Sequence, residues 1–292
     1  MNEVLIVSRA VHFGSCLVLL GVFAVWLLIE RPGAGRRGMG WRLAAVCLAA
    51  AMGSGLLWLW AAAAGMSGSS MMESLNPQLF ELVLGQTPPG HVWIFRSVVA
   101  GLIAAAICFR RGRGIVGIVL VAVFVGSLAW LGHAGAGEGM RRVEMLTADV
   151  AHLLAAGVWP GGLLPMALVL RRGMRVGELA EARAGARRFS AMSLAAVGVL
   201  AGSGVTNACF LVGSFHALVG TDYGRLLMVK VTLFAAAAGL GACNLLIHKP
   251  GLDAAPEALG AMARKVWMEA GLGALIVLVV AVMGTLPPGA QP

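Results

Sequence analysis

The sequence has few charged residues: Asp, Glu, Lys and Arg make up only 12% of its 292 residues, while 59% are apolar. A soluble domain usually carries about 25% charged and about 45–50% apolar residues. The chain cannot hide this apolar excess inside a water-facing globule. The scarcity of charge therefore excludes a soluble fold and indicates a protein that lies in a lipid bilayer.

Several motifs that would define other protein classes are also missing. The five cysteines form no CxxC pair and their number is odd, which argues against a disulfide framework. No Walker A pattern, GxSxG or HExxH occurs, and no apolar span holds paired carboxylates. We therefore expect neither direct use of ATP nor enzymatic activity, and we predict no catalytic residues. Residues 1–9 lack the basic start and cleavage site of a signal peptide, so we expect the first span to be retained.

Apolar runs of about 20 residues recur along the chain, and each is long enough to cross a hydrocarbon core of about 30 Å. They lack the period-two alternation of barrel strands, which indicates helices. The prediction is an all-α polytopic membrane protein with eight transmembrane helices. These lie near residues 4–29, 42–65, 91–109, 114–133, 149–170, 189–213, 224–247 and 266–286.

The net charge of +9 is distributed unevenly between the connections. Of the 22 Lys and Arg residues, 16 lie in alternate connections, those after helices 4–29, 91–109, 149–170 and 224–247. By the positive-inside rule these connections face the cytoplasm, and both termini face the periplasm. The basic charge then reflects topology and contact with anionic lipid, so no nucleic acid is expected as a partner.

The two halves of the sequence share short motifs in the same order. Helices 91–109 and 224–247 each follow a Thr-x-x-Gly step and carry a basic residue six positions after its glycine. We interpret the matches as a 4+4 parallel duplication, with repeats over residues 1–135 and 136–292. Chance similarity between Ala- and Gly-rich helices is the alternative. The matched positions are Thr87, Gly90 and Arg96 with Thr221, Gly224 and Lys230, Ser54 with Ser203, and His12 with His152.

Histidines are the most informative polar residues, because five of the six are predicted near the periplasmic ends of the spans. Asp149 and His152 are three residues apart and share one helix face. The glycine-rich segment 132–139 is flexible enough to bring His133 beside them. Imidazole and carboxylate are ligands for copper(II) or zinc, and thioether and imidazole suit copper(I). The candidate metal ligands are His12, His133, Asp149, His152, His91 and His216.

Each candidate also has a simpler interpretation. A histidine at a helix end, such as His91 or His216, can be a solvated cap. Asp149 can favour a helix N-terminus through the helix dipole. Arg96 and Lys230 either extend toward the interface or pack against a partner carboxylate or carbonyl. The mid-span amides of Asn207 and Asn244 either bind helices together or line a route for the metal ion. The methionines predicted on the same side of the membrane as the five histidines either bind metal or contact lipid. These methionines are Met66, Met71, Met72, Met140 and Met145.

Four stretches resemble the copper-resistance protein D family, CopD/PcoD. They are RAVHFG, GHA, the D-x-x-H step followed by VWPGGLLP, and TDYGRLLMVKVTL, and the resemblance covers nearly the whole chain in order. It implies a bacterial inner-membrane copper transporter that works with a separate periplasmic copper carrier of the CopC type. It also implies copper ligands, for which His133, Asp149 and His152 match the family best, His12 comes next, and His91 and His216 match least.

The predicted function is capture of copper at a periplasmic His/Asp cluster, followed by passage of the ion between the two repeats. Uptake is favoured over export because a ligand cluster at the periplasmic mouth serves capture. One alternative is a b-type haem electron-transfer protein, with His12 and His152 as axial ligands. Another is a copper sensor or scaffold that binds the metal without transporting it.

Overall fold

The computed structural model describes residues 2–29, 39–67, 76–109, 114–132, 139–248, 252 and 256–289. Every regular element within these ranges is helical, which confirms the all-α prediction. The first half contains α1 (Asn2–Ile29), α2 (Met39–Ser67), α3 (Pro77–Gln86), α4 (Pro88–Cys108), α5 (Ile115–Gly126) and the 3-10 helix η3 (Ser127–Leu131). The second half contains α6 (Gly139–Val158), α7 (Pro160–Val176), α8 (Leu179–Leu211), α9 (Phe215–Gly220), α10 (Asp222–Cys243), the π-helix η5 (Asn244–His248) and α12 (Pro256–Met283).

Seven helical segments in the described part of the chain are long and apolar enough to cross a membrane, as expected of a polytopic membrane protein. An eighth apolar run, Ile115–Leu131, corresponds to the predicted span 114–133 but is shorter than the others. The seven are Asn2–Leu27, Gly40–Gly65, Pro88–Cys108, Gly139–Val176, Leu179–Leu211, Asp222–Ile247 and Glu257–Met283.

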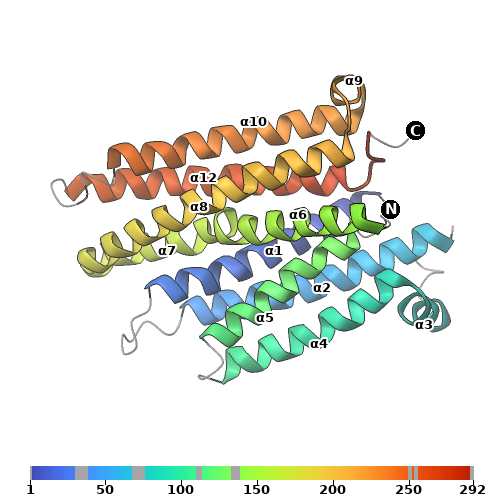
Figure 1. Cartoon of the computed structure of the whole chain (residues 1–292). Coiled ribbons are helices and arrows are strands. Elements are labelled where there is room, and N and C mark those ends of the chain that lie inside the picture. The colour runs from blue at the N-terminus through green and yellow to red at the C-terminus, as the bar shows by residue number, and fades with distance from the viewer. Residues whose placement is uncertain are drawn as a thin grey trace.

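Helix α1 lies in the middle of the bundle and contacts α2, α5, α6, α7, α8 and α12. Figure 1 shows α2, α4 and α5 on one side of α1, and α8, α10 and α12 on the other. The start of α1 and the end of α12 lie at the same end of the bundle, together with the short helices α3 and α9 (Figure 1). The two halves of the chain thus form two groups of helices around α1.

A close crossing of α1 and α7 depends on glycine. A Cβ atom on Gly21 would collide with the carbonyl group of Gly161, and a Cβ on Gly161 would collide with the carbonyl of Leu17. Small residues allow helix backbones to approach closely where lipid supplies no hydrophobic driving force. The Pro-Gly-Gly step that begins α7 therefore fixes the second half of the chain against the first.

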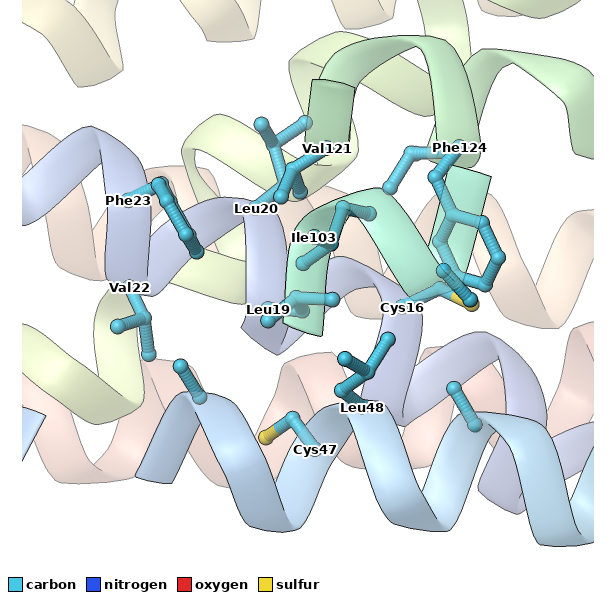
Figure 2. Close-up of a cluster of buried hydrophobic side chains, with 14 of the residues drawn as sticks. Cys16, Leu19, Leu20, Val22, Phe23, Cys47, Leu48, Ile103, Val121 and Phe124 are labelled. Carbon is cyan, nitrogen blue, oxygen red and sulfur yellow. The ribbon is translucent and has the colours of Figure 1, made fainter. Parts of the chain in front are cut away.

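Each group of helices has its own apolar core. In the first, α1 packs against α2, α4 and α5 through Cys16, Leu19, Cys47, Ile103 and Phe124, as Figure 2 shows. In the second, buried side chains of α7, α8 and α12 pack together, including Leu163, Phe189 and Met262. Cys16 and Cys47 lie within the first core, where they act as small packing residues.

The span predicted at residues 149–170 has different boundaries. Helix α6 begins at Gly139, and α7 continues to Val176. The charged residues after Gly139 lower the hydropathy, but they do not interrupt a helix. Asp149 and His152 consequently lie in the middle of α6, and the interpretation that Asp149 favours a helix N-terminus is wrong.

Candidate functional site

The two Thr-x-x-Gly steps begin α4 and α10 with the same geometry. Oγ1 of Thr87 accepts a hydrogen bond from the Gly90 amide at 3.1 Å, and Oγ1 of Thr221 accepts one from the Gly224 amide at 3.0 Å. Both hydroxyls donate to a carbonyl of the preceding short helix, at 2.6 and 2.7 Å. A Cβ on either glycine would collide with that short helix. These caps set the depth of the basic residue six positions later on each helix.

In the first half, His12 is fully buried in a polar cluster between α1, α2 and α4. Its Nδ1 lies 2.7 Å from the Ala51 carbonyl, and its Nε2 lies 2.8 Å from Nη2 of Arg96. Because a carbonyl can only accept, Nδ1 donates and Nε2 accepts from the guanidinium. The rings of Trp58 and Trp93 contact the imidazole edge-on, with centroids 5.6 and 5.2 Å away. The lone pair of His12 is therefore already used by a buried cation.

Arg96 joins three parts of this cluster. Its Nη1 donates to the Phe124 carbonyl at 2.5 Å and to Oγ of Ser127 at 2.7 Å, while Nη2 also lies 3.6 Å from Sγ of Cys16. The guanidinium carbon is 4.1 Å from the centroid of the Phe124 ring. Of the two interpretations of Arg96, extension toward the interface is wrong, and packing against a partner carbonyl is what the structure shows. A buried guanidinium with these partners holds α1, α4 and the α5–η3 segment together.

The equivalent histidine of the second half, His152, has a different environment. Its Nδ1 lies 3.0 Å from Oγ of Ser203, and that hydroxyl donates to the Val199 carbonyl at 2.6 Å. Since the hydroxyl has one hydrogen, Ser203 accepts from Nδ1 of His152. In a neutral imidazole, Nε2 then carries a lone pair, which is the form that binds a metal.

Asp149 lies one turn before His152 on the same helix. Asn207 of α8 donates to its Oδ1 at 3.4 Å, so this mid-span amide joins two helices. Lys230 of α10 acts electrostatically on both Asp149 and His152. Lys230 occupies the position that Arg96 has in the first half, but here the buried cation acts on a carboxylate as well as on a histidine.

A cavity of about 220 Å³ opens beside these residues, between α1, α6, α8, α10 and α12. Carboxylate, imidazole and thioether groups in one cavity form a donor set that suits copper. The positive side chains in the wall offset the charge of Asp149. The polar and sulfur-containing lining residues are Arg9, Met145, Asp149, His152, Asn207, Tyr223, Lys230 and Met283.

The other predicted ligands lie elsewhere. His91 is exposed, with Nε2 3.0 Å from the Gly85 carbonyl, and His216 is exposed on α9. His133 lies outside the described residues, as do Met71, Met72 and the side chain of Met66. In the part of the chain that the structure describes, no group of three or more His, Cys, Asp or Glu residues could hold a metal ion. The structure thus brings together Asp149, His152 and Met145, and it places His12 in a separate cluster.

Sequence reasoning missed one buried carboxylate. Glu269 of α12 is only 3% exposed, and its Oε1 accepts a hydrogen bond from Nδ2 of Asn244 at 2.7 Å. The signal was present in the sequence, because an acidic residue inside a predicted span is a functional candidate by default.

Comparison with known proteins shows relatives along nearly the whole chain. Residues 1–143 match the family described as Copper resistance protein D-like, N-terminal domain, and residues 183–283 match Copper resistance protein D. Copper resistance protein D of Pseudomonas syringae pv. tomato is 31% identical over 240 residues, which is 77% of each chain. Copper transport protein CutJ of Bacillus subtilis is 29% identical over 235 residues, which is 77% of this chain and 42% of that protein. Inner membrane protein YebZ of Escherichia coli is 29% identical over 295 residues, covering 97% of this chain and 98% of that one. No solved structure matches the chain.

Proposed function

Because the chain belongs to the copper resistance protein D family, we propose that it transports copper across the bacterial inner membrane and is not an enzyme. The names of two relatives refer to copper resistance and copper transport, and a third is named as an inner membrane protein. Seven apolar helices fit a multi-pass transporter. We therefore interpret the polar cavities of the bundle as binding sites for copper, the proposed cargo.

The observation that carries this proposal is the cavity of the second half. His152 presents an unprotonated Nε2, Asp149 supplies a carboxylate on the same helix face, and Met145 supplies a thioether. We propose that these groups capture the ion, with His133 as a further ligand. Lys230 neutralises Asp149 before capture and loses that interaction when the metal ion takes its place.

The role of His12 follows from its partner. A copper ion could bind Nε2 of His12 only after Arg96 releases it, because that lone pair accepts from the guanidinium at 2.8 Å. We propose that His12 contributes to copper passage in such a rearranged state, and that His91 and His216 act only at the surface. The haem alternative would need the same lone pair for iron, and the names of the relatives favour copper.

The organisation of the bundle supports a wider proposal. We propose eight spans in two parallel repeats, residues 1–135 and 136–292, with both termini in the periplasm. Equivalent threonine caps begin α4 and α10, and the start of α1 lies at the same end of the bundle as the end of α12 (Figure 1). In this orientation the Asp149 cavity opens toward the periplasm, which favours uptake and delivery by a CopC-like carrier.

Copper flux into proteoliposomes tests this function. The Asp149→Asn variant keeps the size of the side chain but removes the charge, so we expect flux to fall by roughly tenfold to a hundredfold, as for loss of a charged ligand. The matched control is Asp222→Asn, because the Asp222 side chain is 79% exposed on α10. No copper flux in wild-type vesicles that still bind copper would leave the sensor or scaffold alternative and refute transport.

A further inference from the structure

A second cavity lies within the second half of the chain, bounded by α7, α8, α10, η5 and α12. Its volume is about 200 Å³, close to that of the Asp149 cavity. Its wall is mostly apolar but contains the carboxylate of Glu269, the amide of Asn244, the hydroxyl of Ser193 and the thioether of Met262. A carboxylate inside a membrane bundle is costly unless a cation or hydrogen-bond donors face it.

The polar groups around Glu269 are incompletely paired. Glu269 accepts hydrogen bonds from Asn244, at 2.7 Å, and from the indole of Trp159. Oδ1 of Asn244, a residue only 3% exposed, is buried without a hydrogen-bond partner among the described residues, and so is Oγ of Ser193. Buried acceptors are almost always satisfied. Two unsatisfied oxygens beside a carboxylate form a set that a cation would complete.

The backbone at this site is also unusual. Helix α10 ends at Cys243 and continues as the π-helix Asn244–His248, which begins at the residue that binds Glu269. Single π-turns inside helices occur frequently at functional sites. The C-terminal end of a helix carries partial negative charge and favours a cation. The charged group that acts on Glu269 from its own helix is Lys265, one turn earlier.

The two cavities are stacked along the same helices. Helices α8, α10 and α12 line both cavities. Figure 1 shows that the end of α8, the start of α10 and the end of α12 lie at the α9 end of the bundle, so the lining residues of the Asp149 cavity are nearer that end. Trp159 lines the Glu269 cavity and meets the ring of Phe234 edge-on, with centroids 5.8 Å apart; Phe234 lies on α10 between Lys230 of the first cavity and Ala238 of the second. In each pair that follows, the first residue lines the Asp149 cavity and the second lines the Glu269 cavity: Gly204 and Val197 on α8, Lys230 and Ala238 on α10, and Ile276 and Glu269 on α12.

We infer that the Glu269 cavity is a second binding station for the transported copper ion, on a route that runs inside the second half of the bundle. The carboxylate of Glu269, Oδ1 of Asn244 and Oγ of Ser193 bind the ion there, and Met262 adds a thioether. Trp159 and Phe234 separate the two stations. Because Trp159 donates to Glu269, an ion that binds this carboxylate competes with the contact that holds the indole in place. This inference rests on the proposed function.

Copper bound per chain, measured by mass spectrometry after equilibrium dialysis against copper(II) and, separately, copper(I), tests the second station in the full-length protein. We expect wild-type protein to bind a copper ion in each cavity. Glu269→Gln, which keeps the shape but not the charge, should lose one ion, and Asp149→Asn should lose the other. Glu257→Gln is the matched control, because Glu257 is exposed at the start of the same helix.

A second variant distinguishes loss of the copper site from an effect of Glu269→Gln on folding. A Cβ on Gly241 would lie 3.4 Å from Oε2 of Glu269, an ordinary contact, so Gly241→Ala should fold and fill the space beside the carboxylate. Gly239→Ala is its control, because a Cβ there meets nothing within 4 Å. The inner station is refuted if Glu269→Gln or a folded Gly241→Ala still binds as much copper as wild type. It is also refuted if wild type binds a single ion that only Asp149→Asn removes, a result that leaves the proposed function intact. Wild-type protein that binds no copper would overturn the proposed function as well.

Discussion

Replacing Arg96 by lysine should strongly destabilise the protein although it conserves the charge. Arg96 donates to the Phe124 carbonyl, to Ser127 Oγ and to His12 Nε2, at 2.5, 2.7 and 2.8 Å. These acceptors are reached by two nitrogens of a planar fork, whereas a lysine ammonium is a single point and keeps about one of the bonds. With two charge-assisted hydrogen bonds lost, at about 1.5–3 kcal/mol each, we expect the free energy of unfolding to fall by about 3–6 kcal/mol.

The assay is unfolding in mixed micelles, followed by the fluorescence of the eight tryptophans, of which Trp58 and Trp93 contact His12. The control is Arg225→Lys, because the Arg225 side chain is 61% exposed and an exposed substitution should change stability by less than about 0.5 kcal/mol. An Arg96→Lys protein within about 1 kcal/mol of wild type would refute the account of Arg96 as the residue that joins α1, α4 and α5.

Two glycine substitutions test other contacts. Gly204→Ala places a methyl group 3.5 Å from Cε1 of His152, so the variant should fold but bind copper more weakly. Gly202→Ala is the control and should leave copper binding unchanged, because a Cβ there meets nothing within 4 Å. Equal copper affinities of the two variants would argue against His152 as a ligand. Gly161→Ala forces α7 away from the Leu17 carbonyl of α1 and should lower the free energy of unfolding by about 1–3 kcal/mol, measured by the same unfolding assay. An unchanged value would mean that the crossing of α1 and α7 is loose.

Local motifs were predictable from the sequence because short-range chemistry defines them. The Thr-x-x-Gly steps were recognised as a repeated motif before two predicted helices, and in the structure each step caps one of these helices. The i, i+3 spacing of Asp149 and His152 likewise placed both residues on one helix. Hydropathy located all eight apolar runs, but it put the start of α6 ten residues too late, because charged residues near Gly139 lower hydropathy without ending a helix.

The partners of buried polar residues depend on packing between distant segments, and they were less predictable. His12 and His152 occupy matched positions, yet only His12 has its Nε2 bonded to a guanidinium. The difference arises because Arg96 reaches the histidine lone pair, whereas Lys230 faces Asp149 beside a cavity. Glu269 could have been found as an acidic residue inside a predicted span, but its partner Asn244 lies on the π-helix after α10, which no local pattern in the sequence indicates.

The most direct test of the central claim is the copper coordination of the purified protein, measured by X-ray absorption at the copper edge. If the Asp149 cavity captures copper, wild type should show imidazole scattering, and His152→Ala should lose the contribution of one ring. Glu269→Gln should keep that imidazole contribution, because His152 is not a ligand of the inner station. An imidazole signal undiminished in a folded His152→Ala protein would contradict the assignment of His152 and the proposed capture site.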